Sequence, residues 1–228
     1  LEAKIGANPY LRLNWSYDMP KLPTINGSIS ARWTDLNMLN FIGNANKLSL
    51  NYFSTTQELY ISNIHWRYFD IKGGLRNEVF DIRNVRASQF TGNYDFDQLT
   101  NDFVSPYLDA RTDTFDDGYF PTRGVNAGLS YSWTFAGFPH RFNNFHTLQA
   151  DAKTVLPIGD IFAFIPSFNF RFLFGEEIPV AYFNAIGGSL AGRYVDQQMP
   201  FLGVTNLSAM KNMLTIYRAD LRFTLAKN

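Results

Sequence analysis

The sequence has no cysteine, no net charge and no long apolar run, and each absence excludes a class of protein. With Cys 0, the chain forms no disulfide and no thiolate metal site. Its 20 basic and 20 acidic residues balance to +0, which gives no support to nucleic-acid binding or to a polybasic membrane patch. No segment approaches the roughly 18 apolar residues of a membrane-spanning helix. The first residues also lack the apolar region of a signal peptide.

Aromatic residues, by contrast, are abundant. Phe 22, Tyr 12 and Trp 4 make up 17% of the chain, yet the mean hydropathy is only -0.18. A helical membrane protein would be less polar on average, whereas a membrane β-barrel has this balance because half of each strand faces a wet lumen. At 228 residues the chain can be a single all-β domain.

The clearest pattern is a two-residue alternation between residues 162 and 174. Side chains of a β-strand point to opposite faces with period two, so this stretch predicts one strand with an apolar face and a polar face. The apolar face carries Phe162, Phe164, Phe168, Phe170, Phe172 and Phe174; the polar face carries Ala163, Ser167, Asn169 and Arg171. A row of phenylalanines this long fits either a protein core or lipid.

Similar alternation recurs along the chain and predicts roughly ten strands of about ten residues, the length of tilted spanning strands. The segments are 10–17, 25–33, 36–41, 47–53, 59–68, 70–82, 104–115, 125–135, 146–156, 162–174 and 215–225. Residues 84–102 are polar and aperiodic, which predicts a surface loop, and residues 175–211 predict a second, longer loop. No segment has a convincing helical period.

These patterns favour an antiparallel transmembrane β-barrel over a soluble β fold. The strands are longer than the five or six residues usual in a sandwich. Aromatics also gather near strand ends, as at Trp15 and Trp66, where membrane barrels carry their aromatic girdles. The polar faces carry charges of both signs, and we expect these to face the lumen: Asp151, Lys153, Arg171, Arg218, Asp220 and Arg222. The alternative is a soluble β-barrel that binds lipid inside, with its Phe face turned inward.

Two motifs resemble those of a known family, the bacterial surface-antigen barrels, whose superfamily includes the outer-membrane assembly insertase. The first is similar to the D-x-G-x-F-P-T-x-G turn and comprises Asp116, Gly118, Phe120, Pro121 and Gly124. The second is similar to the inward-folded loop G-G-x-x-x-R-G-[FY] and comprises Gly187, Gly188, Gly192, Arg193 and Tyr194. The run NAIGGSLAGRYVDQQMPFLGV resembles most the barrels of patatin-like phospholipases of Bacteroidetes-type bacteria.

The resemblance implies that residues 1–228 are one outer-membrane β-barrel domain, and that this domain is partial. Family barrels have more strands than these segments supply, so we expect the chain to be a partial barrel. The long loop 175–211 would fold inward, and Arg193 would pair with a lumenal carboxylate, Asp151 or Asp220. This loop reads Gly-Arg-Tyr where the insertase pattern reads Arg-Gly-Tyr, so a solvated Arg193 is the alternative.

No arrangement of residues predicts catalysis, a cofactor or a metal. Ser189 lacks the G-x-S-x-G turn that a patatin-like hydrolase needs. The three histidines, His65, His140 and His146, have no ligand spacing, and the acidic loop 94–102 lacks the spacing of a calcium loop. We therefore predict no catalytic, cofactor-binding or metal-binding residue.

The predicted function is an outer-membrane barrel that anchors or translocates an upstream patatin-like phospholipase, in the manner of type V secretion. The alternatives are an insertase or transporter barrel of the same superfamily and the soluble lipid-binding barrel. The expected location is the outer membrane of a Gram-negative bacterium. Expected partners are outer-membrane lipid and an attached or translocated hydrolase domain, with a homodimer as an option and no nucleic acid.

Overall fold

The computed structural model of the chain describes eleven stretches, which contain all the strands reported below. They are residues 1–6, 8–39, 47–88, 102–136, 144–159, 161–176, 178–179, 182–187, 198–199, 201 and 209–223. Within these residues no helix is long and apolar enough to cross a membrane.

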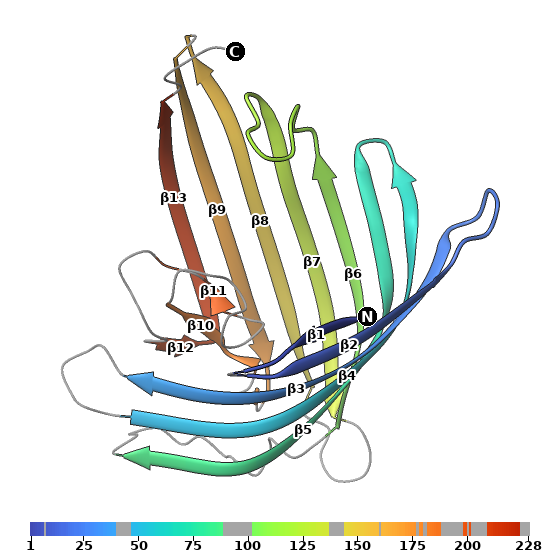
Figure 1. Ribbon diagram of the computed structural model, residues 1–228, viewed down its shortest axis with the longest axis vertical. Helices are drawn as coiled ribbons and strands as arrows, with labels where there is room; N and C mark the ends of the chain where they lie inside the picture. The colour runs from blue at the N-terminus through green and yellow to red at the C-terminus, as the bar shows by residue number, and fades with distance from the viewer. Residues whose placement is uncertain are drawn as a thin grey trace.

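The fold is dominated by one large, curved, antiparallel sheet (Figure 1). Its strands are β1 (Glu2–Lys4), β2 (Tyr10–Tyr17), β3 (Thr24–Leu39), β4 (Lys47–Trp66), β5 (Phe69–Ser88), β6 (Asp102–Asp113), β7 (Gly124–Ala136), β8 (Asn144–Ile158), β9 (Phe162–Gly175) and β13 (Met213–Phe223). Each pairs with its neighbour in chain order, and β13 pairs with β9. Within the described residues β1 and β13 form the two edges and do not pair with each other, so the sheet is open.

The all-β antiparallel fold predicted from the alternation is confirmed. Three predicted boundaries are wrong. Residues 47–53 and 59–68, predicted as two strands, form the single strand β4 up to Trp66, which stays paired with β3 from Lys47 to Ser62. Residues 36–39 continue β3 rather than forming a separate short strand, because their backbone stays in register with 47–50 of β4. Residues 84–88 belong to β5 rather than to a loop, since they pair with 47–51 of β4 beyond a bulge. Backbone pairing with a neighbouring strand extends a strand past the point where its side chains stop alternating.

A second, small sheet forms between β9 and β13. It contains β10 (Asn184–Ile186), β11 (Gln198–Met199) and β12 (Ala209–Lys211), with β10 in the middle. Figure 1 shows this small sheet beside the lower ends of β9 and β13. The sequence predicts only a loop here, because segments of two or three residues are too short to show alternation.

The large sheet has two unlike faces. We call the inner face the one that contacts Tyr182 of the segment after β9; the opposite face is the outer face. The outer face carries a ladder of phenylalanine rings along β9, in which Phe168, Phe170, Phe172 and Phe174 follow one another at centroid distances of 5.3–6.5 Å. It also carries half-exposed leucines of β4 to β7, all 52–54% exposed: Leu59, Leu75, Leu108 and Leu129. An apolar face of this extent is suited to lipid contact.

The two ends of the sheet also differ. At the turn end, at the top of Figure 1, the strands are joined by residues 18–23, 67–68, 114–123 and 159–161. At the loop end they are joined by residues 40–46, 89–101, 137–143 and 176–212. Short connections at one end of the sheet and longer ones at the other are typical of membrane β-barrels.

Aromatic side chains lie on the outer face near both ends. Near the turn end, Phe162 of β9 contacts Phe223 of β13 at a centroid distance of 5.1 Å. Near the loop end, His146 stacks on Trp133 and Phe174, and its Nδ1 lies 2.7 Å from the Tyr131 hydroxyl. Two such bands are typical of the interfacial girdles of membrane barrels.

Candidate functional site

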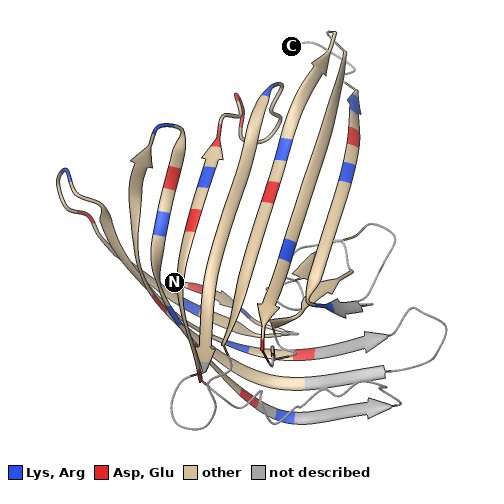
Figure 2. Cartoon of the chain, turned by 180° about the vertical axis from the view of Figure 1, so that it is seen from behind, with Lys and Arg blue, Asp and Glu red and all other residues tan. Residues whose placement is uncertain are grey.

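The candidate site is the inner face of the sheet. Charged residues recur along the strands (Figure 2), and the strand register shows which of them lie on this face. The register places the six charges predicted to line the lumen on the same face. Gln149, Asp151 and Lys153 of β8 pair with Arg171, Asn169 and Ser167 of β9, which in turn pair with Leu214, Ile216 and Arg218 of β13. Asp220 and Arg222 follow Arg218 at two-residue spacing. Paired residues of neighbouring strands share a face, so all six lie on the side of Arg171.

Two ion pairs involve these predicted charges. Arg111 of β6 reaches Asp151 of β8 at 3.3 Å, across the intervening strand β7. It can do so because Gly128 stands between them in register: a Cβ there would lie 2.8 Å from Asp151 Oδ1 and 3.0 Å from Arg111 Nη2. Arg218 binds Asp220 on its own strand at 2.8 Å. Both carboxylates that the sequence offers to Arg193 thus have another arginine partner, and Arg193 lies outside the described residues.

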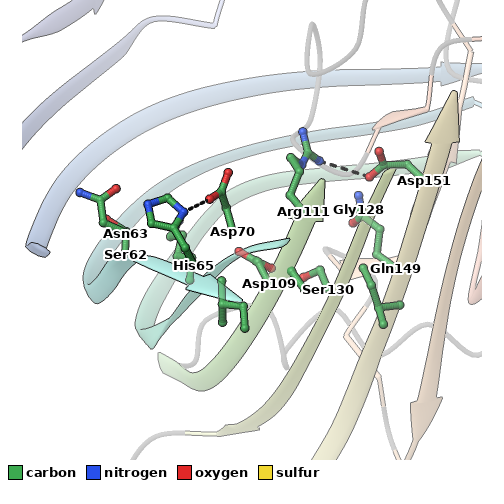
Figure 3. Close-up of a pocket in the computed structure, with 14 residues that line it drawn as sticks. Ser62, Asn63, His65, Asp70, Asp109, Arg111, Gly128, Ser130, Gln149 and Asp151 are labelled. Carbon is green, nitrogen blue, oxygen red and sulfur yellow. Dashed lines mark hydrogen bonds and ion pairs between the residues drawn. The ribbon is translucent and has the colours of Figure 1, made fainter. Parts of the chain in front are cut away.

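The half of the inner face near the turn end, which we call the turn half, is open. A cavity of about 500 Å³ lies over β4 to β8 and is lined by polar side chains (Figure 3). His65 bonds to Asp70 on one side of it, and the Arg111–Asp151 pair lies on the other. A second hollow of about 310 Å³ lies over β7 to β9 and β13 and includes Lys153 and Arg218. This half is suited to holding water.

The half near the loop end, which we call the loop half, is covered by the segment after β9. The Tyr182 ring lies among three phenylalanine rings, with centroids 5.7 Å from Phe80, 5.2 Å from Phe103 and 4.9 Å from Phe145. These rings come from β5, β6 and β8, and all four aromatics are buried. The Tyr182 side chain therefore packs against three strands of the large sheet that precede it in the chain.

Hydrogen bonds hold the same segment through both the hydroxyl and the backbone carbonyl of Tyr182. The Tyr182 hydroxyl donates to Glu78 of β5 at 2.7 Å, and Arg171 Nη1 donates to the Tyr182 carbonyl at 2.9 Å. Arg171 also binds Asn184 Oδ1 at 2.6 Å, and the Asn184 amide returns a bond to the Arg171 carbonyl at 3.1 Å. Because Asn184 is fully buried, these bonds satisfy groups that would otherwise be costly to bury.

A buried carboxylate organises the neighbouring strands. Glu58 of β4, whose side chain is 7% exposed, accepts from Arg76 of β5 at 2.6 Å, from Ser28 of β3 at 3.2 Å and from Arg12 of β2 at 3.5 Å. Arg76 lies over the Tyr107 ring of β6 at 4.9 Å. One carboxylate thus links four strands to an aromatic ring on a fifth.

The predicted turn motif forms the β6–β7 connection, where Asp116 and Asp117 fix its shape. Asp116 accepts the backbone N–H of Thr122 at 2.7 Å and that of Arg123 at 3.2 Å, together with the Thr122 hydroxyl. These bonds lower the pKa of Asp116 to about 2, with the Thr122 hydroxyl contributing most. Asp117 accepts the N–H groups of Tyr119 and Phe120 at 2.7 and 2.8 Å, which lowers its pKa. Both aspartates act as turn formers.

The other motif positions show why this turn needs its residue types. Gly124 has φ +115, and a Cβ there would lie 2.3 Å from the Thr114 carbonyl oxygen, so only glycine fits. Pro121 is buried, and its carbonyl accepts a hydrogen bond from Arg222 of β13. The turn therefore reaches the inner face of the last described strand, while Gly118 and Phe120 stay exposed.

Of the predicted inward-loop motif, only Gly187 lies within the described residues. Gly187 is buried with φ +133; its N–H donates to the Met199 carbonyl, and its own carbonyl accepts from Gln198 at 2.6 Å. Gly188, Gly192, Arg193 and Tyr194 lie outside the described residues, as do Ser189 and His140. Their predicted roles stay predictions.

The residues that hold the loop half were not predicted as site residues. Glu58, Tyr107 and Tyr182 are the main ones. Glu58 and Tyr107 sit on strands whose alternation is visible, but nothing in that alternation shows that they would meet across β5. Tyr182 lies in a segment without periodicity, so the sequence has no signal for its burial. In the described part of the chain, no group of three or more His, Asp and Glu side chains could hold a metal ion.

Comparison with known proteins gives one family. No curated protein matches the chain. The sequence profile of the OMP85 superfamily matches residues 13–228, which include every strand of the large sheet except β1 and the start of β2. Members of this superfamily are outer-membrane proteins of Gram-negative bacteria with insertase- or transporter-type functions. The chain, with its two-faced antiparallel sheet, belongs to the OMP85 superfamily.

Proposed function

We propose that this chain is the membrane-embedded part of an outer-membrane protein that anchors or translocates a patatin-like phospholipase. The superfamily supports the location and the transport-type role. The resemblance of residues 184–204 to the barrels of patatin-like phospholipases supports the hydrolase as cargo. The chain's own contribution is structural, and we assign no catalytic residue to it.

The observation that carries the transport role is the contrast between the two faces of the sheet. The outer face offers phenylalanine and leucine side chains to lipid, and the inner face offers ion pairs and hollows of about 500 and 310 Å³ to water. A charged face is stable at membrane depth only where it lines a hydrated or protein-filled space. The segment held by Tyr182 then covers the loop half of that space, which supports a lumen that is closed at rest.

The transport role is tested by reconstituting the protein in liposomes loaded with a small fluorescent dye. The wild-type protein is expected to release the dye slowly, because the segment held by Tyr182 covers the loop half. Replacement of Tyr182 by alanine is expected to speed release several-fold. Replacement of the exposed Tyr119, on the turn, is the matched control and should leave release unchanged. Equal release by all three proteins would contradict a lumen closed by this segment.

The hydrolase cargo requires a separate experiment. The complete gene is expressed in a Gram-negative host, the outer membrane is isolated, and phospholipase activity is measured on intact cells and on the membrane fraction. The proposal predicts activity that sediments with the barrel and is lost when the upstream reading frame is deleted. An outer-membrane barrel without such activity would instead support the second candidate, an insertase or transporter of other proteins, which the superfamily assignment favours.

A further inference from the structure

Beneath the segment held by Tyr182, the inner face contains two small adjoining cavities. One is about 180 Å³ and the other about 80 Å³, and both are lined by Arg76, Glu78, Gln149, Arg171 and Tyr182. A cavity needs only roughly 10–15 Å³ to hold one water molecule, so each has room for several. The kind of molecule that suits them depends on the charge, polarity and access of their walls.

The charges around the cavities balance. Arg76 binds Glu58 at 2.6 Å, and Arg171 is matched by Glu78, which lines the same two cavities. Arg32 lines only the larger cavity and is itself partnered, in part by an aromatic ring of β2 at 5.2 Å. Charges held away from bulk water need partners of opposite sign, and here the protein supplies them. The occupant that suits these walls is therefore uncharged.

The smaller cavity is lined mainly by hydroxyl groups. They lie on the inner face of β6, β7 and β8 and belong to Ser105, Tyr107, Ser130, Ser132, Thr134 and Thr147. On β7 they alternate with the large side chains of Tyr131 and Trp133, which point to the outer face. Small polar residues at the inward positions provide both space and hydrogen-bonding groups, which a hydrated cavity requires.

One of these hydroxyls needs a partner that the described residues do not supply. The Tyr107 side chain is 6% exposed, and its hydroxyl oxygen is buried without a hydrogen-bond partner in the described part of the chain. Its ring is held between strands by Arg76 at 4.9 Å and Lys72 at 5.2 Å. Buried hydroxyls are almost always hydrogen-bonded, so this one indicates a small molecule in the cavity. Water is uncharged, fits the space, and both donates and accepts.

The smaller cavity also adjoins the open hollow of the turn half. Gln149 and Ser130 line both this cavity and the hollow of about 500 Å³. Exposure falls inward, since Gln149 is exposed, Ser130 is half-buried and Ser105 is only 2% exposed. The polar wall is therefore continuous from the hollow into the cavity, and it ends at the aromatic rings packed around Tyr182.

We propose that the two cavities bind ordered water and form the inner end of a water-filled path from the turn-half hollow to the aromatic rings around Tyr182. Water enters past Gln149 and Ser130, bonds to the hydroxyls of β6 to β8 and supplies the partner that Tyr107 lacks. The aromatic rings then form the dry end of the path. This site does not depend on which cargo the barrel serves.

Radiolytic labelling tests the site on the unmodified protein in detergent. A short X-ray pulse converts water into hydroxyl radicals, which oxidise neighbouring aromatic rings, and mass spectrometry locates the added oxygen. Tyr107 is expected to be oxidised at least about tenfold faster than Phe103, a ring of comparable reactivity that is 1% exposed and lines neither cavity. If the protein is mixed with heavy-oxygen water seconds before the pulse, Tyr107 should take up the isotope to the same fraction as Tyr119, which is 92% exposed.

Tyr107→Phe gives an independent test through the sign of its effect on the unfolding temperature. If water satisfies the hydroxyl, the variant loses a hydrogen bond, and the unfolding temperature should fall by roughly 2–4 °C. If the cavity is dry, the same change removes a buried polar group without a partner, and the temperature should rise. Tyr119→Phe, at an exposed tyrosine, is the matched control and should leave the temperature unchanged.

Three results would overturn the proposal. The first is oxidation of Tyr107 that is no faster than that of Phe103, which would show a dry cavity. The second is uptake of heavy oxygen at Tyr119 but not at Tyr107, which would show trapped water and no path from the hollow. The third is an unfolding temperature of Tyr107→Phe equal to or above that of the wild type.

Discussion

The loop half and the turn half of the inner face are built from similar residue types but stabilised in different ways. In the loop half, Glu58 and Tyr182 are buried, and the segment after β9 covers the strands. In the turn half, the side chains of Arg111 and Asp151 are 61% and 27% exposed and border an open hollow of about 500 Å³. Burial, rather than charge content, distinguishes the two halves.

The difference matters because burial changes how much a polar contact contributes to stability. An exposed ion pair contributes roughly 0–1 kcal/mol, since water screens it, whereas breaking a buried pair costs several times more. The loop half therefore carries the rigid part of the inner face, and the turn half carries adaptable, hydrated charges. The following substitutions test this contrast.

The largest effect is expected for Tyr182→Ala. It empties a site enclosed by three aromatic rings and removes the hydroxyl that donates to Glu78, so docking of the segment should weaken by about 3–5 kcal/mol. Limited proteolysis between β9 and β13 measures this as faster cleavage at low protease concentration. Tyr119→Ala, at a tyrosine that is 92% exposed, is the control and should change stability by less than about 0.5 kcal/mol. Similar cleavage rates for the two variants would show that the loop half is not more rigid than the turn half.

The next effect concerns the β6–β7 turn, which the bonds of Asp116 and Asp117 fix at the turn end. Gly124→Ala forces a left-handed backbone and a Cβ overlap with the Thr114 carbonyl, so the free energy of unfolding should fall by about 2–4 kcal/mol. Urea unfolding in lipid vesicles measures the change. Gly118→Ala lies in the same turn with no atom within 4 Å of the added Cβ, and it should be nearly neutral. If Gly124→Ala left the free energy of unfolding unchanged, the backbone of this turn would adjust as readily as the open surface of the neighbouring hollow.

Ion pairs give a direct, smaller comparison. A double-mutant cycle on Glu58 and Arg76 should give a coupling free energy of about 1–2 kcal/mol, discounted because the Arg76 side chain is 35% exposed. The same cycle on Arg111 and Asp151 should give less than about 1 kcal/mol. The cycles use Gln for Glu and Arg and Asn for Asp, with stability measured by urea unfolding. Equal couplings would show that solvent reaches both halves alike.

The smallest effect is a local pH dependence at the turn. The pKa of Asp116 is lowered from 3.8 to about 2, so its contribution to turn stability is complete above pH 3.8 and is lost as the pH falls through about 2. Hydrogen exchange of the Thr122 and Arg123 amides should accelerate over this window, beyond the intrinsic pH effect. Asp116→Asn should abolish the transition, whereas Asp117→Asn leaves the Thr122 bonds in place. A Thr122 amide with the same protection at pH 5 and pH 2 would contradict the assigned bonds.

Much of the fold was predictable because strand alternation is a local property. The Phe162–Phe174 ladder and the position of Arg171 on the opposite face follow from the two-residue period alone. The strand ends at 36–39 and 84–88 were not predictable, since pairing with β4 rather than side-chain pattern extends them.

The site was predictable only in part, for a related reason. Alternation assigns a charge to a face, so Asp151 and Arg218 could be expected there. It does not show which charges meet across strands, as Arg111 and Asp151 do over Gly128. Burial of Tyr182 depends on a tertiary contact with residues about a hundred positions away, and no local pattern records such a contact.

The bond from Arg222 to the Pro121 carbonyl has a consequence for the order of assembly. The β6–β7 hairpin can form from neighbouring sequence, but the bond from Arg222 to its turn forms only once β13 has joined the sheet. Contacts between distant parts of a chain form late, since a long loop must close first. The final geometry of this early hairpin therefore depends on a late strand, and a spectroscopic probe on the turn would report when β13 joins the sheet.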